Sequence, residues 1–174
     1  MSSFEKIYLS LGANLTSPKD KLKAALQEIE KLPSTKVNKV SSLYQTKPIS
    51  FVPQEDFLNI ACELISSLPP FTLLAQLQEI EKMLGKVPKP KSDPRPIDID
   101  MIFYGSLTLQ TDSLILPHPH WRNRLFVLVP LNEIADSIET TSLSSLIESF
   151  SEEEREGVRL FQKDWFTHAI FSSP

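Results

Sequence analysis

Two aspartates, Asp98 and Asp100, stand one residue apart within an aliphatic stretch, and this spacing is the strongest chemical signal in the sequence. Residues two apart on a β-strand point to the same face, about 6–7 Å from each other. The spacing therefore predicts a strand with both carboxylates on one side and the aliphatic residues in a core. Carboxylates this close repel each other, and Mg²⁺, which prefers a few carboxylates together with phosphate oxygens, relieves the repulsion. A solvated strand face is one alternative, because Asp-x-Asp is a common pattern. A second alternative is a metal-dependent glycosyltransferase, in which the same pattern occurs.

A basic, proline-rich segment comes directly before the aspartates. Its four basic residues are Lys86, Lys89, Lys91 and Arg95. Prolines in this segment exclude regular secondary structure. A polyphosphate carries several negative charges, and a metal together with basic side chains can neutralise them. The segment is therefore compatible with a phosphate site and with a charged surface loop.

Histidines and aromatic residues supply further candidates. His118 and His120 could bind a transition metal or contact phosphate, and surface histidines are the alternative. Phe57 and Asn59 alternate onto the polar face of a predicted strand, where a ring could stack on a flat heterocycle and an amide could bond its edge. Phe126 begins an apolar run, so packing in a core is its default interpretation.

The elements that must position these residues follow from hydrophobic periodicity. Alternating and helical patterns predict, in order, a strand at 6–11, a helix at 18–32, strands at 37–44 and 57–65, a helix at 70–84 and a strand at 97–104. This order is that of the ferredoxin-like βαββαβ fold. We therefore expect an α+β protein with an antiparallel sheet and helices packed on one face. The polar, proline-containing stretch 45–56 is long for a structural link, and such loops are often functional.

Extra elements are expected at the C-terminal end. Helical pieces are predicted at 119–135 and 142–150, and the segment 158–166 fits either a helix or a strand. The tail from 151 to 174 carries no recognisable motif. Because no repeat or domain linker interrupts the chain, we expect residues 1–174 to form a single domain.

Composition narrows the class of protein. With 41% hydrophobic and 23% charged residues, the chain is typical of a globular protein, which excludes disordered and fibrous classes. Its net charge of -4 argues against general nucleic-acid binding. Cys62 is the single cysteine, so no intrachain disulfide is expected.

The sequence also suggests a location. It shows neither a secretory signal nor an apolar run long enough to span a bilayer. We therefore expect a cytoplasmic protein with small-molecule substrates and with no nucleic-acid or membrane partner. The sequence does not reveal the oligomeric state, and a monomer is the working expectation.

Taken in order, these segments resemble the 6-hydroxymethyl-7,8-dihydropterin pyrophosphokinases of folate biosynthesis. The resemblance extends over about residues 8–135. It rests on the following motifs: Leu11-Gly12-Ala13-Asn14-Leu15, Ser41-Ser42-Leu43-Tyr44-Gln45-Thr46, Phe57-Leu58-Asn59, Gln78-Glu79-Ile80-Glu81, Pro94-Arg95-Pro96-Ile97-Asp98-Ile99-Asp100, Leu116-Pro117-His118, Asn123-Arg124-Leu125-Phe126 and Pro130-Leu131-Asn132-Glu133-Ile134-Ala135. Several ordered motifs in one small chain make the resemblance specific.

The resemblance implies a reaction and a set of site residues. Pyrophosphate would pass from ATP to the hydroxymethyl group of the pterin, with release of AMP. The residues implied in catalysis are Asp98, Asp100, Arg95 and Lys86, and the two aspartates would also hold two Mg²⁺ ions. Pterin contacts are implied for Thr46, Ile49, Phe57, Asn59, Asp98 and Phe126, with the two phenylalanines on either side of the ring. ATP contacts are implied for Gln78, Glu81, Lys86, Arg95, Ile99, His118 and Arg124.

The sequence also departs from the family pattern. The family often has arginines and a tryptophan in the loop before the aspartates, whereas this chain has lysines and prolines there. Asp93 stands where glycine is usual, and Pro119 stands where an aromatic is frequent. We expect altered loop closure or weaker phosphate clamping, with the reaction retained. Two rival interpretations stay open, a metal-dependent glycosyltransferase and a non-catalytic ferredoxin-like module that binds a nucleotide or a partner.

Overall fold

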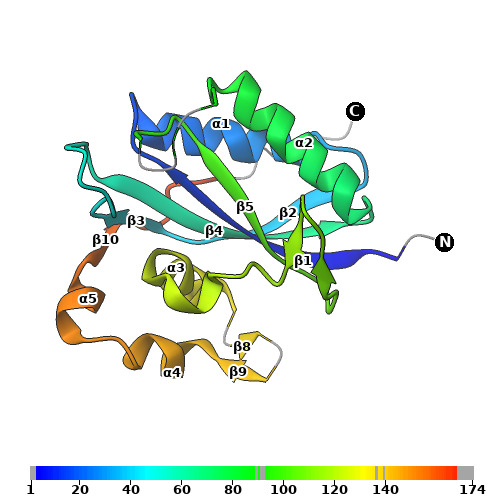
Figure 1. The fold of residues 1–174 in the computed structure, drawn as a ribbon. Coiled ribbons are helices and arrows are strands. Elements are labelled where there is room, and N and C mark those ends of the chain that lie inside the picture. Colours follow the sequence, from blue (N-terminus) through cyan, green and yellow to red (C-terminus); the bar gives the residue numbers. More distant parts are fainter. Residues whose placement is uncertain (1–2, 89, 91–92, 136, 139, 168–174) are drawn as a thin grey trace.

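The computed structural model of the protein describes residues 3–88, 90, 93–135, 137–138 and 140–167. Its elements follow the predicted order, with further elements at the C-terminal end (Figure 1). The strands are β1 (Glu5–Ala13), β2 (Thr35–Val40), β3 (Leu43–Thr46), β4 (Phe57–Ser66), β5 (Asp98–Tyr104), β6 (Leu109–Gln110), β7 (Ile115–Leu116), β8 (Ser137–Ile138), β9 (Thr141–Ser142) and β10 (Val158–Gln162). The helices are α1 (Pro18–Glu30), α2 (Pro70–Met83), α3 (Leu125–Ile134), α4 (Leu143–Glu148) and α5 (Glu152–Glu156), and η1 (Trp121–Asn123) is a 3₁₀ helix.

An antiparallel sheet forms the centre of the fold. Its strand order is β10-β3-β4-β1-β5, and β2 pairs with the part of β4 that lies beyond β3. The neighbouring strands in this sheet run antiparallel. With β2 and β3 counted as one interrupted strand, the first and third predicted strands lie side by side in the middle, as in a ferredoxin-like sheet. The predicted α+β class and the antiparallel sheet are therefore confirmed.

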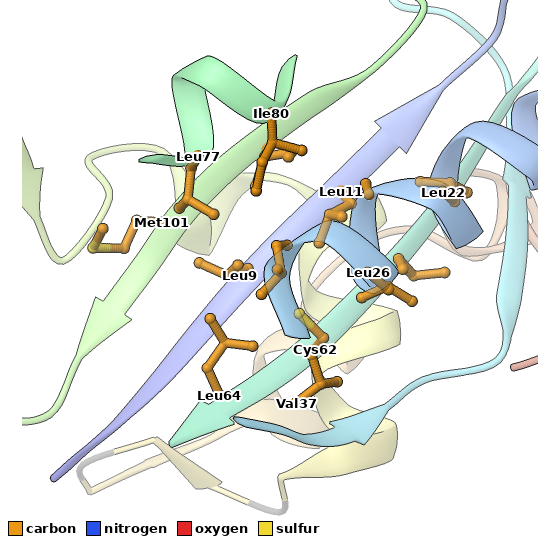
Figure 2. Packing of buried hydrophobic residues seen from close by; sticks show 14 of the residues in the cluster. Leu9, Leu11, Leu22, Leu26, Val37, Cys62, Leu64, Leu77, Ile80 and Met101 are labelled. Carbon is orange, nitrogen blue, oxygen red and sulfur yellow. The ribbon is translucent and has the colours of Figure 1, made fainter. Parts of the chain in front are cut away.

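The larger core lies between the sheet and helices α1 and α2, which cover one face (Figure 1). Leu22 and Leu26 of α1 and Leu77 and Ile80 of α2 point into this core (Figure 2). The sheet meets them with alternate residues of its strands, among them Leu9, Leu11, Cys62, Leu64 and Met101. The apolar alternation that predicted the strands therefore faces these two helices, and burial of its side chains drives their packing.

Helices α1 and α2 of the predicted core lie on one face as expected, whereas α3, one of the additional C-terminal helices, covers the opposite face and α4 packs against α3 (Figure 1). A second buried cluster joins Leu128 and Leu131 of α3 to Ala61 of β4 and to Phe103 of β5. An irregularity in the pairing of β1 with β5 accompanies the turn of Phe103 toward α3. The sequence predicted these helical pieces but not the face that they cover, because most of the α3-side residues near the site are polar.

The predicted strand 37–44 is interrupted. It divides into β2 and β3 at Ser41 and Ser42, although both parts pair with β4. At the break the Ser41 hydroxyl accepts a hydrogen bond from the Ala61 backbone N–H at 2.9 Å. The Ser41 carbonyl accepts one from the Trp165 indole, also at 2.9 Å. Side chains thus satisfy backbone groups at a point where the regular ladder is lost.

The C-terminal tail carries no recognisable motif, yet its strand β10 belongs to this sheet. β10 pairs with β3, so the segment that fitted either a helix or a strand contains a strand. Lys19 at the start of α1 donates a hydrogen bond to the Gln162 side chain at 2.8 Å, and Trp165 is buried in the larger core. Helix α4 confirms the helical piece predicted at 142–150. Within the part of the chain that the structure describes, the helices are too short or too polar to cross a membrane.

Candidate active site

One row of residues crosses the sheet on the face that α3 covers. Gly12 in β1 pairs with Asn59 of β4 on one side and with Asp98 of β5 on the other. Tyr44 of β3 extends the row, because it pairs with Asn59. Directly opposite residues of neighbouring strands share a face. The register therefore places Asn59 and Asp98 on the same surface, two strand spacings apart, which is about 10 Å.

Gly12 lets the Asn59 side chain lie across the sheet. A Cβ at residue 12 would stand 2.6 Å from Asn59 Oδ1, which real Cβ atoms do not tolerate. The Asn59 amide in turn donates a hydrogen bond to Thr46 Oγ1 at 2.6 Å, and both side chains are buried. Sequence reasoning did not identify Gly12 as part of the site. A glycine inside a strand, where it signals close approach of another group, could have revealed it.

Aromatic side chains from two elements border this face. Phe57 begins β4 and is half-buried, and its side chain alternates onto the same face as Asn59. Phe126 lies in α3, where it is half-buried and packs against the second cluster. The Arg124 guanidinium carbon lies 5.7 Å from the centre of the Phe126 ring. The sheet and α3 thus each supply an aromatic ring on the side of the molecule that carries the row.

A cluster of charged residues surrounds Asp98. The Lys86 ammonium lies 2.7 Å from Asp98 Oδ1 and 2.9 Å from Glu81 Oε1. Arg95 Nη1 lies 3.4 Å from the same Asp98 oxygen. Asp100 shares the face of Asp98 and pairs with Ser10 of β1, two residues along the strands from the pair of Gly12 with Asp98. The predicted association of the basic segment with the aspartates is therefore present for Lys86 and Arg95, whereas Lys89 and Lys91 lie outside the described residues.

Burial and hydrogen bonds shift the pKa values of Glu81 and Lys86 in opposite directions. Burial raises the pKa of the Glu81 carboxyl above its ordinary value, and hydrogen bonds from Lys86 and from the Ile99 amide only partly offset that effect. Burial also works to lower the pKa of the Lys86 ammonium, but its hydrogen bonds to Asp98 and Glu81 outweigh burial and raise it. Lys86 therefore stays positively charged beside the two carboxylates.

The outer edge of β5 is lined by groups from two other parts of the chain. Glu81 Oε1 accepts a hydrogen bond from the Ile99 N–H at 2.7 Å. Further along, the His118 N–H donates to the Ile102 carbonyl at 2.9 Å, and His118 Nδ1 accepts from the His120 N–H at 3.2 Å. Because β5 is an edge strand of the sheet, these contacts hold α2 and the His118 segment against it.

The structure does not bring every predicted residue into contact with the cluster. The Ile49 side chain is 87% exposed on the loop between β3 and β4. Gln78 is exposed on α2, one helical turn before Glu81. The Ile99 side chain belongs to the larger core and faces away from the aspartates, so only its main chain is near them. Their roles toward a nucleotide or a pterin remain predictions.

The aspartate pair fits a magnesium site that a polyphosphate completes. Asp98 and Asp100 are half-buried, and their carboxylate oxygens are the donors that Mg²⁺ prefers alongside phosphate oxygens and water. Among residues with described side chains, no group of three or more His, Cys, Asp or Glu is arranged to hold a metal. The donor set therefore matches an ion shared with a phosphate ligand, and it does not match an all-protein metal cage.

Comparison with known proteins agrees with this arrangement. A family model described as 7,8-dihydro-6-hydroxymethylpterin-pyrophosphokinase matches residues 8–136. The chain is 36% identical over 166 residues to the 2-amino-4-hydroxy-6-hydroxymethyldihydropteridine pyrophosphokinase of Bacillus subtilis, covering 93% of this chain and 96% of that protein. It is 35% identical over 148 residues to the enzyme of the same name from Haemophilus influenzae, covering 83% of this chain and 92% of that protein.

A solved structure shares the fold. The HPPK-DHPS protein of Plasmodium falciparum, crystallised with pterin and p-hydroxybenzoate, superposes with a TM-score of 0.68 at 15% identity. The match covers 88% of this chain and 43% of that longer chain, so the chain spans less than half of that protein.

These matches and the ferredoxin-like fold define a phosphoryl-transfer enzyme. The chain belongs to the 7,8-dihydro-6-hydroxymethylpterin-pyrophosphokinase family of folate biosynthesis. Members of this family are ATP-dependent diphosphotransferases, so the predicted family, reaction and enzyme class are confirmed. The glycosyltransferase and binding-module interpretations are set aside by the same finding.

Proposed function

We propose that this chain transfers pyrophosphate from ATP to 6-hydroxymethyl-7,8-dihydropterin on the sheet face that carries the Asn59–Gly12–Asp98 row. The observation that supports this location is the register, because it sets the Asn59 amide, which could bond a heterocycle edge, and the Asp98 carboxylate, which could bind a metal, two strand spacings apart, or about 10 Å. That separation suits a bicyclic ring whose edge is held by Asn59 and whose hydroxymethyl arm reaches toward Asp98.

On the pterin side, the proposed contacts come from the sheet, from α3 and from the loop after β3. Phe57 and Phe126 would hold the two faces of the ring, and Asn59 its edge. The hydrogen bond from Asn59 to Thr46 orients the Asn59 amide, so this group would need no reorientation when the substrate binds. Ile49 lies on an exposed loop, so its proposed contact requires that loop to approach the site.

On the nucleotide side, the proposed contacts come from the charged cluster and from the outer edge of β5. Lys86 and Arg95, which lie 2.7 and 3.4 Å from Asp98, would neutralise phosphate charge next to the aspartates. Arg124 and His118 are the further proposed phosphate contacts. Gln78 and Glu81 would face the nucleotide from α2, and Ile99 would contribute main-chain contact.

The proposed chemistry is direct in-line attack. The hydroxymethyl oxygen of the pterin attacks the β-phosphorus of ATP, the bond from the β-phosphorus to the oxygen that bridges it to the α-phosphorus breaks, and AMP leaves. Asp98 and Asp100 would hold two Mg²⁺ ions. When bound, these ions would lower the pKa of the hydroxyl group and neutralise phosphate charge. The protein contributes chiefly by positioning, which can supply about 7–11 kcal/mol in favourable cases.

Two loops would exclude water from the reaction. In this proposal, closure of the loop 47–56 and of the segment before Asp98 would shield the phosphates. The lysines in this segment, where the family often has arginines, keep the positive charge but lose the two-pronged geometry of a guanidinium group. The proposal therefore includes weaker clamping of the phosphates. A cytoplasmic location, where ATP is available, is part of the proposal.

The proposal is tested by product analysis. The protein is incubated with ATP, Mg²⁺ and 6-hydroxymethyl-7,8-dihydropterin that is labelled with ¹⁸O at the hydroxymethyl oxygen. The products are separated, and their masses are measured by mass spectrometry. We expect AMP and a pyrophosphorylated pterin that retains the label, and we expect both products to vanish when the metal is chelated. Folded protein that binds ATP but forms no AMP would contradict the proposed function.

A further inference from the structure

Glu133 of α3 carries a carboxylate that the proposed chemistry does not use. Its Oε1 accepts hydrogen bonds from the Ser42 backbone N–H at 2.9 Å and from the Ser42 hydroxyl at 2.8 Å. Its Oε2 accepts a hydrogen bond from the Tyr44 hydroxyl at 2.6 Å. Ser42 lies at the break between β2 and β3, and Tyr44 lies in β3. These three hydrogen bonds, which we call the α3 clasp, join the helix to the sheet.

Both ends of the α3 clasp lie next to proposed pterin contacts. On the sheet, Tyr44 pairs directly with Asn59, so their backbones are one strand spacing, or about 5 Å, apart. On the helix, Phe126 and Glu133 are separated by about two turns, so they share one flank of α3 and lie about 10 Å apart along its axis. The clasp therefore links the strand beside Asn59 to the helix flank that carries Phe126.

The α3 clasp can fix the orientation of α3 in a way that apolar packing does not. Leu128 and Leu131 bury the helix against the sheet, but burial of apolar surface is non-directional. Hydrogen bonds to a carboxylate are directional, and they are stronger than those between neutral groups. Burial and the hydrogen bond to Glu133 raise the pKa of the Tyr44 phenol above its ordinary value, so the phenol remains a donor at neutral pH. The clasp thus sets the gap between this flank of α3 and β3.

We propose that Glu133 is a positioning residue that holds Phe126 at the distance from Phe57 that a pterin ring requires. The proposal rests on the proposed function, in which these two phenylalanines hold the faces of the ring. Without the α3 clasp, the flank that carries Phe126 can move away from the sheet, and the ring loses one of its two aromatic contacts. The charged cluster around Asp98 is held by separate ion pairs. Loss of the clasp should therefore weaken pterin binding and leave nucleotide binding unchanged.

The affinities for pterin and for nucleotide are measured separately with the whole chain. Pterin is titrated in the presence of Mg²⁺ and a non-hydrolysable ATP analogue, and the analogue is also titrated without pterin. Glu133→Met accepts none of the three hydrogen bonds, so its Kd for pterin should rise about tenfold, while its Kd for the analogue stays within about twofold of wild type. Glu133→Gln still has polar atoms for Ser42 and Tyr44 and should recover most of the pterin affinity. An unchanged Kd for pterin in Glu133→Met, or equal losses for both ligands, overturns the proposal.

Two further variants separate positioning from direct contact and from loss of stability. Tyr44→Phe removes one bond of the α3 clasp and should weaken pterin binding, but it should cause no further loss when combined with Glu133→Met. Fully additive losses would show that the Tyr44 hydroxyl acts independently of Glu133 and would contradict the proposal. Trp165→Phe is the matched control, because it removes the hydrogen bond to the Ser41 carbonyl, next to Ser42, and leaves the clasp in place. A loss of pterin affinity in this control as large as that in Glu133→Met would also overturn the proposal.

Fluorine NMR without substrates tests the position of the Phe126 ring independently of binding and activity. With 4-fluorophenylalanine at position 126, the fluorine resonance should shift or broaden in Glu133→Met and in Tyr44→Phe, and it should stay unchanged in Trp165→Phe. An unchanged resonance in folded Glu133→Met and Tyr44→Phe contradicts the inference. Wild-type protein that binds neither substrate would instead count against the proposed function, and the fluorine result would still decide whether Glu133 positions Phe126.

Discussion

A methyl group at residue 12 would test whether the site is built around Asn59. In Gly12→Ala the new Cβ would lie 2.6 Å from Asn59 Oδ1, 3.7 Å from its Cγ and 3.8 Å from Phe57 Cδ1. The shortest of these distances cannot persist, and the Asn59 amide is the group that can rotate away. Its rotation would break the 2.6 Å hydrogen bond to Thr46 Oγ1.

The size of the effect follows from burial. Asn59 and Thr46 expose only 4% and 6% of their surfaces, so the separated groups would lose a partner inside the protein. An unsatisfied buried polar group costs about 1–3 kcal/mol, and the free energy of unfolding should fall by about this amount. If Asn59 also bonds the pterin edge, its displacement should weaken pterin binding by about tenfold or more, since about 1.4 kcal/mol is tenfold.

The assay combines chemical denaturation with pterin titration on four proteins: wild type, Gly12→Ala, Asn59→Ala and the double variant. Once the Asn59 amide is absent, the methyl group meets no oxygen, so the two substitutions should be strongly non-additive. Pterin affinity in Gly12→Ala within about twofold of wild type, or additive effects on stability, would refute the proposed role of the Asn59–Gly12 contact.

Three other substitutions test separate parts of the structure. Lys86→Met removes the ammonium from between Asp98 and Glu81 and should lower kcat/KM for ATP by about tenfold to a hundredfold, with partial recovery in Lys86→Arg; steady-state kinetics measure this. Burial works to raise the pKa of the Glu63 carboxyl, but hydrogen bonds from Tyr8 and Asn38 lower it overall. A lowered folded pKa gives stability that is present above the ordinary value of 4.5 and lost as pH falls below it, so urea unfolding of Glu63→Gln should be less sensitive to acid than that of wild type. Trp165→Phe leaves the buried Ser41 carbonyl without its 2.9 Å indole bond and should reduce the free energy of unfolding by about 1–3 kcal/mol with kcat unchanged; a large fall in kcat would mean that the tail reaches the site.

Periodicity was sufficient to predict the sheet, because its strands bury one alternating face against α1 and α2. The same alternation placed Asp98 with Asp100, and Phe57 with Asn59, on common faces, and the register shows that both pairs lie on the α3 side. Sequence spacing within one strand could not reveal that register. It depends on pairing between strands that are far apart in the chain.

Other features depended on contacts that leave little trace in a local pattern. The break at Ser41 needs no proline or glycine, since it is supported by Trp165 from the tail. The Asn14 side chain forms hydrogen bonds with Gln54 and with Arg95, and the distance of these residues along the sequence hides the contacts. Glu81 was placed near ATP by resemblance alone, and its bond to the Ile99 amide becomes visible only when α2 lies beside the edge of β5.

We propose that Asp98 and Asp100 form the catalytic centre of this pyrophosphokinase. The most direct measurement is kcat/KM for AMP formation in Asp98→Ala/Asp100→Ala at saturating Mg²⁺, compared with Glu152→Ala/Glu153→Ala, which removes two exposed carboxylates of α5. We predict a loss of about a thousandfold or more in the aspartate variant and almost none in the control. An aspartate variant that folds normally and stays within about tenfold of wild type would show that these two carboxylates are not the catalytic centre.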